Sequence, residues 1–143
     1  MAKSANHSTY DAHYHIVFPV KYRKALLDKG VELAIPEIAH DIQQRYDIEF
    51  EKIGCDSNHI HLLVSYKPSL STSEVVGIFK SITARELFKR FPQLKKDLWK
   101  GQFWSDGFYM ATVGERGNWN IVKQYIQNQG NTMSEPQQLR LLT

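Results

Sequence analysis

Apolar and polar residues follow two different periods along this chain of 143 residues. Short runs in which apolar residues alternate predict strands, whereas apolar residues spaced by three and four positions predict helices. The expected strands span residues 14–20, 48–53, 59–66 and 108–113, and the expected helices span residues 31–46, 71–90 and 118–129. Their order contains the β-α-β-β-α-β pattern. It predicts an α+β, ferredoxin-like (RRM-like) antiparallel sheet with helices on one face and an added C-terminal helix.

Local signals predict where the helices begin and end. The sequence from Ser71 to Glu74 is a capping box, and Pro92 ends the helix that follows at about Arg90. Pro36 falls early in the preceding helical pattern, so we expect that helix to begin near Ile35. The strand at residues 48–53 alternates with one slip.

Length and composition predict one domain over residues 1–143, in which residues 130–143 form a polar, partly mobile tail. The only cysteine is Cys55, which excludes an internal disulfide and a cysteine-based zinc cluster. The polar N-terminus lacks the apolar core of a signal peptide, and no segment is long and apolar enough to span a membrane. We therefore expect a cytoplasmic protein.

Basic residues concentrate in one segment, although the net charge is only +3. Positions 80–100 hold seven of the 18 Lys and Arg residues against two acidic residues, a local net charge of +5. A second group is Lys21, Arg23 and Lys24. Such clusters are the usual electrostatic footprint of phosphate binding, and a solvated helix face is the alternative. The predicted DNA contacts are Lys80, Arg85, Lys89, Lys95, Lys96 and Arg23. Weaker candidates for stacking on unpaired bases are Phe103, Trp104 and Tyr22, and we expect at least one of these aromatic residues to belong to the core instead.

Two His-x-His motifs are candidate metal sites. Residues two apart on a strand point to the same face, so His59 and His61 can reach one metal ion while Ile60 points into the core. The alternative is a pair of imidazoles on an exposed sheet face. His13 and His15 have the same spacing, but they lie at the start of a strand with a tyrosine between them. We rank this pair below the other.

The last predicted helix carries a second candidate group. Trp119, Val122 and Ile126 form its apolar stripe, and Tyr125 lies about 100° away from Ile126 around the helix axis. Gln129 follows Tyr125 by one turn on the same side. A phenol and an amide oxygen therefore project together, unless Tyr125 is simply a surface residue of an amphipathic helix.

The two groups occur together in one chain, and in this combination the sequence resembles the single-tyrosine HUH transposases of the insertion-sequence 200/605 family and their REP-associated relatives. The resemblance covers nearly the whole chain. The segments that carry it are Tyr14-His15, Val20-Lys21-Tyr22-Arg23, Asn58-His59-Ile60-His61-Leu62-Leu63, residues 75–90, Leu98-Trp99-Lys100-Gly101, Phe103-Trp104 and Tyr125-Ile126-Gln127-Asn128-Gln129.

The resemblance implies a role for each motif. His59, His61 and Gln129 would bind a divalent metal, magnesium or manganese, and Tyr125 would be the nucleophile. The enzyme would cleave and rejoin single-stranded DNA with hairpin ends through a 5′-phosphotyrosine intermediate. It would be a homodimer in which the tyrosine helix of one subunit completes the active site of the other.

Three other functions remain open at the level of sequence. The first is a non-catalytic nucleic-acid binder, including a domesticated, non-mobile relative that binds hairpin DNA. This reading leaves the histidines and Tyr125 without a joint purpose. The second is a relaxase or replication initiator, which usually carries further domains. The third is a metal-dependent hydrolase, which would not depend on Tyr125.

Overall fold

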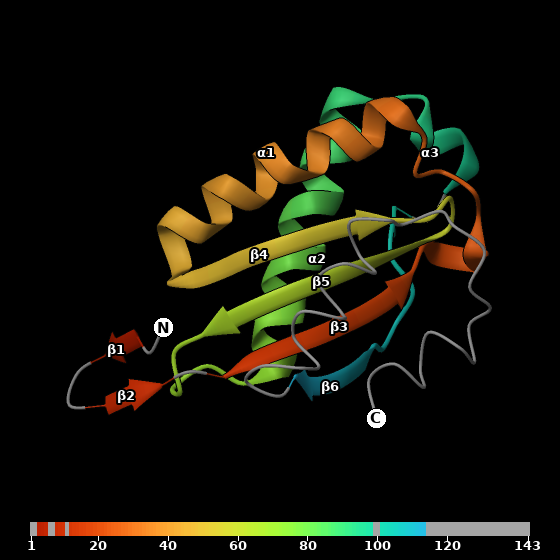
Figure 1. Ribbon diagram of the computed structural model, residues 1–143. Helices are drawn as coiled ribbons and strands as arrows, with labels where there is room; N and C mark the ends of the chain where they lie inside the picture. The colour runs from red at the N-terminus through yellow and green to blue at the C-terminus, as the bar shows by residue number, and fades with distance from the viewer. Residues whose placement is uncertain (1–2, 6–7, 11, 99–100, 114–143) are drawn as a thin grey trace.

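A four-stranded sheet with two long helices on one face forms the centre of the molecule (Figure 1). The structure is a computed structural model and describes residues 3–5, 8–10, 12–98 and 101–113. The sheet and the helices are made of β3 (His13–Pro19), α1 (Lys29–Tyr46), β4 (Ile48–Cys55), β5 (His59–Tyr66), α2 (Thr72–Arg90) and β6 (Tyr109–Val113). The strands lie in the order β4-β5-β3-β6, and each neighbouring pair is antiparallel. This is the strand order of a ferredoxin-like sheet, and it confirms the predicted fold class.

Shorter elements flank this unit. The turn η1 (Lys21–Arg23) follows β3, and α3 (Leu94–Asp97) follows α2. A hairpin of β1 (Lys3–Ala5) and β2 (Ser8–Tyr10) precedes β3, and the sequence analysis did not predict it. The predicted helix at residues 118–129 lies outside the described residues. No helix in the described part of the chain is long and apolar enough to cross a membrane.

Helix α1 begins at Lys29, two residues before the predicted pattern at residue 31 and six before the start near Ile35 that Pro36 suggested. Asp28 caps it, because its side chain accepts a hydrogen bond from the Val31 amide at 3.0 Å. Pro36 lies inside the helix, so the prediction that it delays the start was wrong. Proline removes one backbone hydrogen bond, and burial of the apolar face offsets that loss. The buried residues of this face are Val31, Ala34, Ile35, Ile38, Ala39 and Ile42.

Helix α2 follows its sequence signals closely. The Glu74 amide donates to Ser71 Oγ at 3.0 Å, and the Ser71 amide donates to Glu74 Oε1 at 2.9 Å. This reciprocal pair is the predicted capping box, and the helix ends at Arg90 as expected. The apolar residues that face the core at helical spacing include Val75, Phe79, Ile82 and Phe88, all of them buried.

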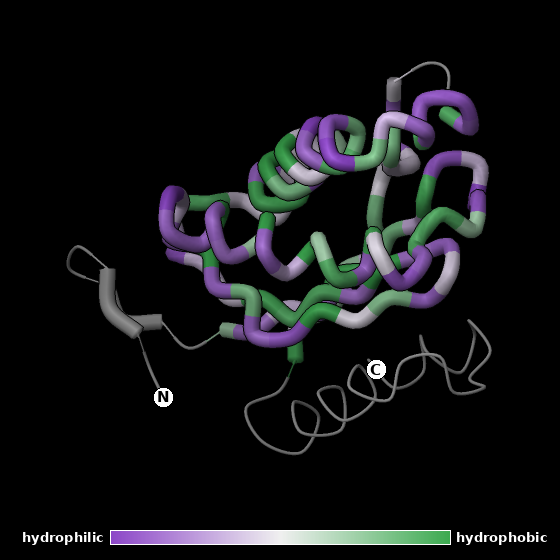
Figure 2. The backbone as a smooth tube through the Cα atoms, turned by 90° about the horizontal axis from the view of Figure 1, so that it is seen from above, coloured by the Kyte–Doolittle hydropathy of each residue, from purple (hydrophilic) through white to green (hydrophobic). Residues whose placement is uncertain are grey.

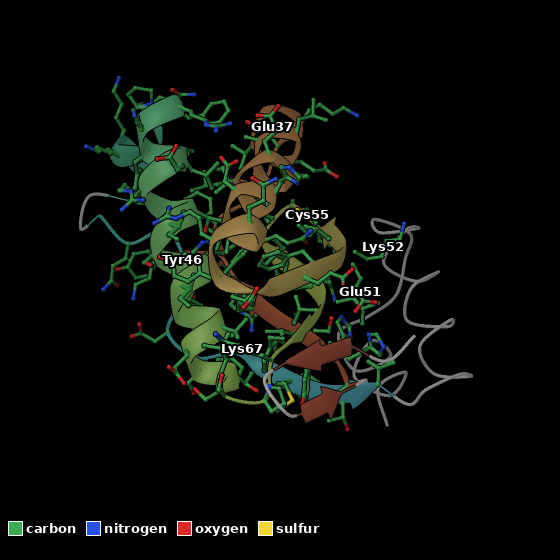
Figure 3. The ribbon with its side chains drawn as sticks, turned by 90° about the vertical axis from the view of Figure 1, so that its left-hand side faces the viewer. Glu37, Tyr46, Glu51, Lys52, Cys55 and Lys67 are labelled. Carbon is green, nitrogen blue, oxygen red and sulfur yellow. The ribbon has the colours of Figure 1, made fainter. Side chains whose placement is uncertain are left out.

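The slip in the β4 pattern is a β-bulge. Phe50 pairs with Val64, but the next paired residue is Lys52, opposite Leu63, so Glu51 is an extra residue. The bulge allows Glu51 and Lys52 to lie on the side of β4 away from the helices (Figure 3). Cys55, by contrast, is the last residue of β4 and lies on its other side, in the core (Figure 3).

The core fills the space between the sheet and the helices, and Figure 2 shows these two layers from above. Phe103 and Trp104 belong to it, with 0 % and 4 % of their surface exposed. Trp104 packs on Phe18 with ring centroids 5.0 Å apart, and its Nε1 donates to Thr83 Oγ1 at 2.9 Å. Their burial excludes both as candidates for base stacking and agrees with the alternative that they belong to the core. An isolated bridge pairs Trp104 with Val20, just after β3.

Candidate metal centre

The face of the sheet opposite the helices carries the two histidines of the first motif. Cross-strand pairs place Pro19 opposite His59 and Val17 opposite His61, so both imidazoles lie on this face. Their ring centroids are 5.0 Å apart. Ile60 is fully buried on the other face, within the core. The expected division of the three residues between the two faces is confirmed.

A carboxylate that the sequence analysis missed joins this pair. Asp56 lies in the turn between β4 and β5, and its amide donates to the His59 carbonyl at 2.9 Å, which closes the turn. Ligand atoms of Asp56, His59 and His61 all lie within 4.8 Å of one another. The available signal was an acidic residue in the turn that leads into a His-x-His strand.

His59 is held from one side and faces the carboxylate with the other. Its Nδ1 lies 2.8 Å from Asn58 Oδ1. Because an amide oxygen only accepts, Nδ1 donates this hydrogen bond. Nε2 lies 2.7 Å from Asp56 Oδ2, yet without hydrogen-bond geometry to any group in the described residues. A ring nitrogen and a carboxylate oxygen this close together form a pair of donors that one cation can bind.

His61 is fully buried and contacts a third histidine. His61 Nδ1 lies 2.9 Å from His15 Nε2, and the two rings stack with centroids 5.1 Å apart. Burial, together with the neighbouring His15 and His59, lowers the pKa of His61 to about 2. Burial also lowers the pKa of His15 to about 4. Both imidazoles are therefore neutral near pH 7, which is the form that binds a metal.

These donors fit a divalent metal ion. Two imidazole nitrogens and one carboxylate oxygen form a mixed donor set of the kind that binds first-row transition metals, including manganese. The described donors are three in number, which leaves coordination positions for a substrate phosphate and water. The donor set by itself is compatible with more than one metal.

The second His-x-His motif does not act as a pair. His13 Nδ1 lies 2.5 Å from Glu51 Oε1, the extra residue of the β-bulge. His15 instead contacts His61 on the neighbouring strand. Sequence spacing alone made the two motifs equivalent, and the strand pairing separates them.

The predicted DNA-binding residues fall into two groups. Lys80 is half-buried, and its Nζ donates to the carbonyl oxygens of Ser105 and Gly107 at 2.6 Å each. Burial lowers its pKa, and Asp106 opposes that effect. Lys80 therefore ties α2 to the 101–107 segment. The other predicted contacts have exposed side chains, namely Arg23, Arg85, Lys89, Lys95 and Lys96.

Lys80 and Arg85 line a groove of about 490 Å³ between α2 and residues 101–107. The main-chain amide of Ser105 donates to the Pro19 carbonyl at 3.0 Å, and Pro19 pairs with His59. The groove and the histidines therefore lie near the same end of β3. Tyr22, 57 % exposed, lies just beyond this end with a positive φ of 58°.

The predicted nucleophile Tyr125 and the predicted third ligand Gln129 lie outside the described residues. Both remain predictions, as does the tail at residues 130–143.

Comparison with known proteins identifies the family. Residues 8–129 match the IS200-like transposase family. The chain therefore belongs to the IS200-like transposases, whose activity is the cleavage and rejoining of DNA.

Two curated relatives support this assignment. The ISDra2 transposase TnpA of Deinococcus radiodurans is 33 % identical over 120 residues, which cover 84 % of this chain and 85 % of the relative. The transposase for insertion sequence element IS200 of Salmonella typhimurium is 30 % identical over 127 residues, which cover 89 % and 82 %.

Two solved structures share the fold. A crystal structure of a proposed transposase from Deinococcus radiodurans R1 matches with a TM-score of 0.71 and 29 % identity, covering 89 % of this chain and 97 % of the other. A REP-associated tyrosine transposase bound to a REP hairpin matches with a TM-score of 0.56, covering 88 % and 70 %. At 11 % identity, the second shows the fold alone.

Proposed function

We propose that this transposase cleaves and rejoins single-stranded DNA at insertion-sequence ends through a covalent 5′-phosphotyrosine on Tyr125. The observation that carries the proposal is the convergence of Asp56, His59 and His61 at one end of the sheet in a chain of this family. A buried, neutral His61 beside His59 and a carboxylate fits a site that handles a phosphate.

The chemistry balances without a further reactant. The Tyr125 oxygen forms a bond to phosphorus, and the bond from phosphorus to the DNA 3′-oxygen breaks. The phenol loses its proton, and the 3′-oxygen gains one. The phosphotyrosine keeps the phosphodiester bond energy, so the 3′-hydroxyl of another strand can reverse the reaction and join the DNA.

The metal donors would be His59 and His61, with the oxygen of Asp56 and that of Gln129 as candidates for the remaining protein ligands. A bound divalent metal supplies a Lewis acid that polarises the scissile phosphate and favours the ionised phenol. The contact from Asn58 to His59 Nδ1 holds that imidazole with its other nitrogen toward the site. The divalent metal that we propose for this site is magnesium or manganese.

The substrate would be single-stranded DNA with hairpin ends, bound to the exposed basic residues of α2, α3 and η1. The local charge of residues 80–100 supports this choice, and a fold neighbour was solved with a hairpin. Arg85 is one such residue, since its side chain is 67 % exposed beside the groove.

A labelled-DNA assay tests the proposal. The protein is incubated with manganese and hairpin DNA that is labelled on either side of the expected cut, then run on a denaturing protein gel. We expect an adduct with the 5′-phosphate fragment, absent in Tyr125→Phe and in His61→Ala. Tyr46→Phe and His40→Ala are the matched controls, because these residues lie on α1 and should leave the adduct unchanged. Cleavage without an adduct would favour a hydrolase, and hairpin binding with neither would favour a domesticated binding protein.

We also propose that the active protein is a homodimer whose sites are completed in trans. Co-expression of Tyr125→Phe and His61→Ala with two affinity tags gives mixed dimers. In trans, one site of each mixed dimer has intact histidines from one chain and an intact tyrosine from the other. The adduct should then reappear at up to about half of the wild-type level and only on the His61→Ala chain. Its absence from purified mixed dimers would overturn completion in trans.

A further inference from the structure

We propose that His15 is a positioning residue, which accepts a hydrogen bond from His61 Nδ1 and so reserves His61 Nε2 for the metal. The proposal rests on the metal-dependent function proposed above and adds a residue to it. His15 would contact neither the DNA nor the metal. It would act only through His61.

Strand pairing fixes this contact. His15 pairs with Leu63, and His61 pairs with Val17, so the two histidines are diagonal neighbours on the same face of adjacent strands. Both side chains are fully buried, with 0 % exposure. The nitrogen atoms lie 2.9 Å apart, and the rings are inclined by only 25°. Neither ring can turn away without breaking the packing around it.

Tautomer chemistry decides which way the proton lies. Two neutral imidazoles joined by one hydrogen bond share a single proton between them. If His61 Nδ1 carries it, His61 Nε2 has a lone pair, and a metal can take that nitrogen. If His15 Nε2 carries it, His61 keeps its own proton on Nε2, where it blocks metal binding. Function as a ligand therefore requires the first arrangement.

The neighbouring ligand shows the same arrangement independently. Asn58 Oδ1 accepts from His59 Nδ1 at 2.8 Å, and that contact leaves His59 Nε2 beside Asp56. Each predicted histidine ligand thus has its Nδ1 held by a polar neighbour. Outer partners of this kind orient a ligand and raise its basicity.

His15 carries a structural cost that packing does not explain. In the required tautomer its Nδ1 bears a proton, and this buried atom has no hydrogen-bond partner within the described residues. A buried polar atom without a partner destabilises the fold, and an apolar residue would fill the position without that penalty. His13, two residues earlier on the same face, hydrogen-bonds Glu51 instead. It offers a matched control.

Metal binding by purified, metal-free protein is the first test. His15→Phe fills the space and removes the acceptor, His15→Gln keeps an acceptor, and His13→Phe makes the same change at the control position. We expect His15→Phe to weaken Mn²⁺ binding about 10- to 100-fold, measured by electron paramagnetic resonance of free Mn²⁺. His15→Gln should recover most of the affinity, and His13→Phe should bind as the wild type does. Equal affinity of His15→Phe and the wild type would overturn the proposal.

The tautomer is the second test, and it needs neither activity nor a folded variant. Two-bond ¹H–¹⁵N correlations of the wild-type protein report which nitrogen of each histidine is protonated, without metal and with Mg²⁺. We expect the Nδ1–H form for His61, and the Nε2–H form in both states would overturn the proposal. Wild-type protein that binds no metal and forms no adduct would instead refute the proposed function, while the metal-free tautomer would still decide the role of His15.

Discussion

On the face that the helices cover, β3 and β5 bury Ile16, Phe18 and Ile60 against α1 and α2. On the opposite face the same two strands carry His15, His59 and His61, whose ring nitrogens contact specific polar partners. Apolar burial is non-directional and scales with area, so the first face tolerates exchange among apolar residues of similar volume. A polar contact depends on position and protonation, so the second face tolerates little exchange. Substitutions at neighbouring residues of one strand should therefore have different effects, namely loss of folding on the first face and loss of metal binding on the second.

The largest contrast should come from Ile60 and His61, which are adjacent in sequence. Ile60→Asp places a charge in the apolar core and should unfold the protein, because the cost of an unpaired buried charge exceeds typical stability. His61→Ala should remain folded and lose metal-dependent adduct formation by more than about 100-fold. Circular dichroism and the gel assay measure the two effects. A folded Ile60→Asp protein, or an active His61→Ala protein, would contradict the division between the faces.

Acid should destabilise the protein through the buried histidines of the second face. The pKa of His15 is lowered from 6.5 to about 4 in the folded protein, so the unfolded chain binds its proton first as pH falls. The stabilisation is complete above pH 6.5 and declines toward pH 4, by roughly 3 kcal/mol for this residue. His61, with its pKa lowered to about 2, acts in the same direction. Denaturant unfolding of metal-free protein at pH 7 and pH 4 measures the loss.

His15→Gln is the matched variant for the acid experiment, because glutamine does not titrate in this range. It should lose less stability than the wild type between the same two pH values. An equal loss in both proteins would assign the acid sensitivity to other groups, such as the carboxylates.

The outer surface of the helix layer should govern DNA binding without affecting the core. Lys95 and Lys96 on α3 are exposed, so the double change to alanine should reduce affinity for hairpin DNA by about tenfold and lower the salt slope by about 1 to 2. Lys80→Met should instead lower the melting temperature, since Lys80 ties two carbonyl oxygens. Fluorescence anisotropy over a salt series, together with thermal melting, tests both. If the Lys80→Met protein has normal stability but binds hairpin DNA weakly, Lys80 contacts DNA as first predicted.

The smallest effect should be local to one helix end. Ser71→Ala removes the acceptor of the Glu74 amide and should destabilise the protein by about 1 kcal/mol, with metal binding unchanged. Ser73→Ala, an exposed change inside α2, should be nearly neutral. If the two variants unfold at the same denaturant concentration, the cap contributes nothing measurable.

Local signals determined most of the architecture. The capping box at Ser71 and the apolar spacing of α2 act within one helix, and both were readable from the sequence. The slip in β4 was also visible as a pattern, although its consequence was not. Pro36 predicted a wrong helix start, because tertiary packing of α1 outweighed its local preference.

The sequence alone determined that His59 and His61 share one face of a strand, since side chains two apart on a strand must do so. It also favoured a ferredoxin-like sheet, because the order of predicted strands and helices along the chain is compatible with few other topologies. Only the tertiary structure decided which other residues stand beside that pair. The strand order β4-β5-β3-β6 places His15 in contact with His61. The β-bulge places Glu51 beside His13, and the turn between β4 and β5 places Asp56 beside His59 and His61. These partners come from different segments, and contacts between strands depend on register, which no local pattern encodes.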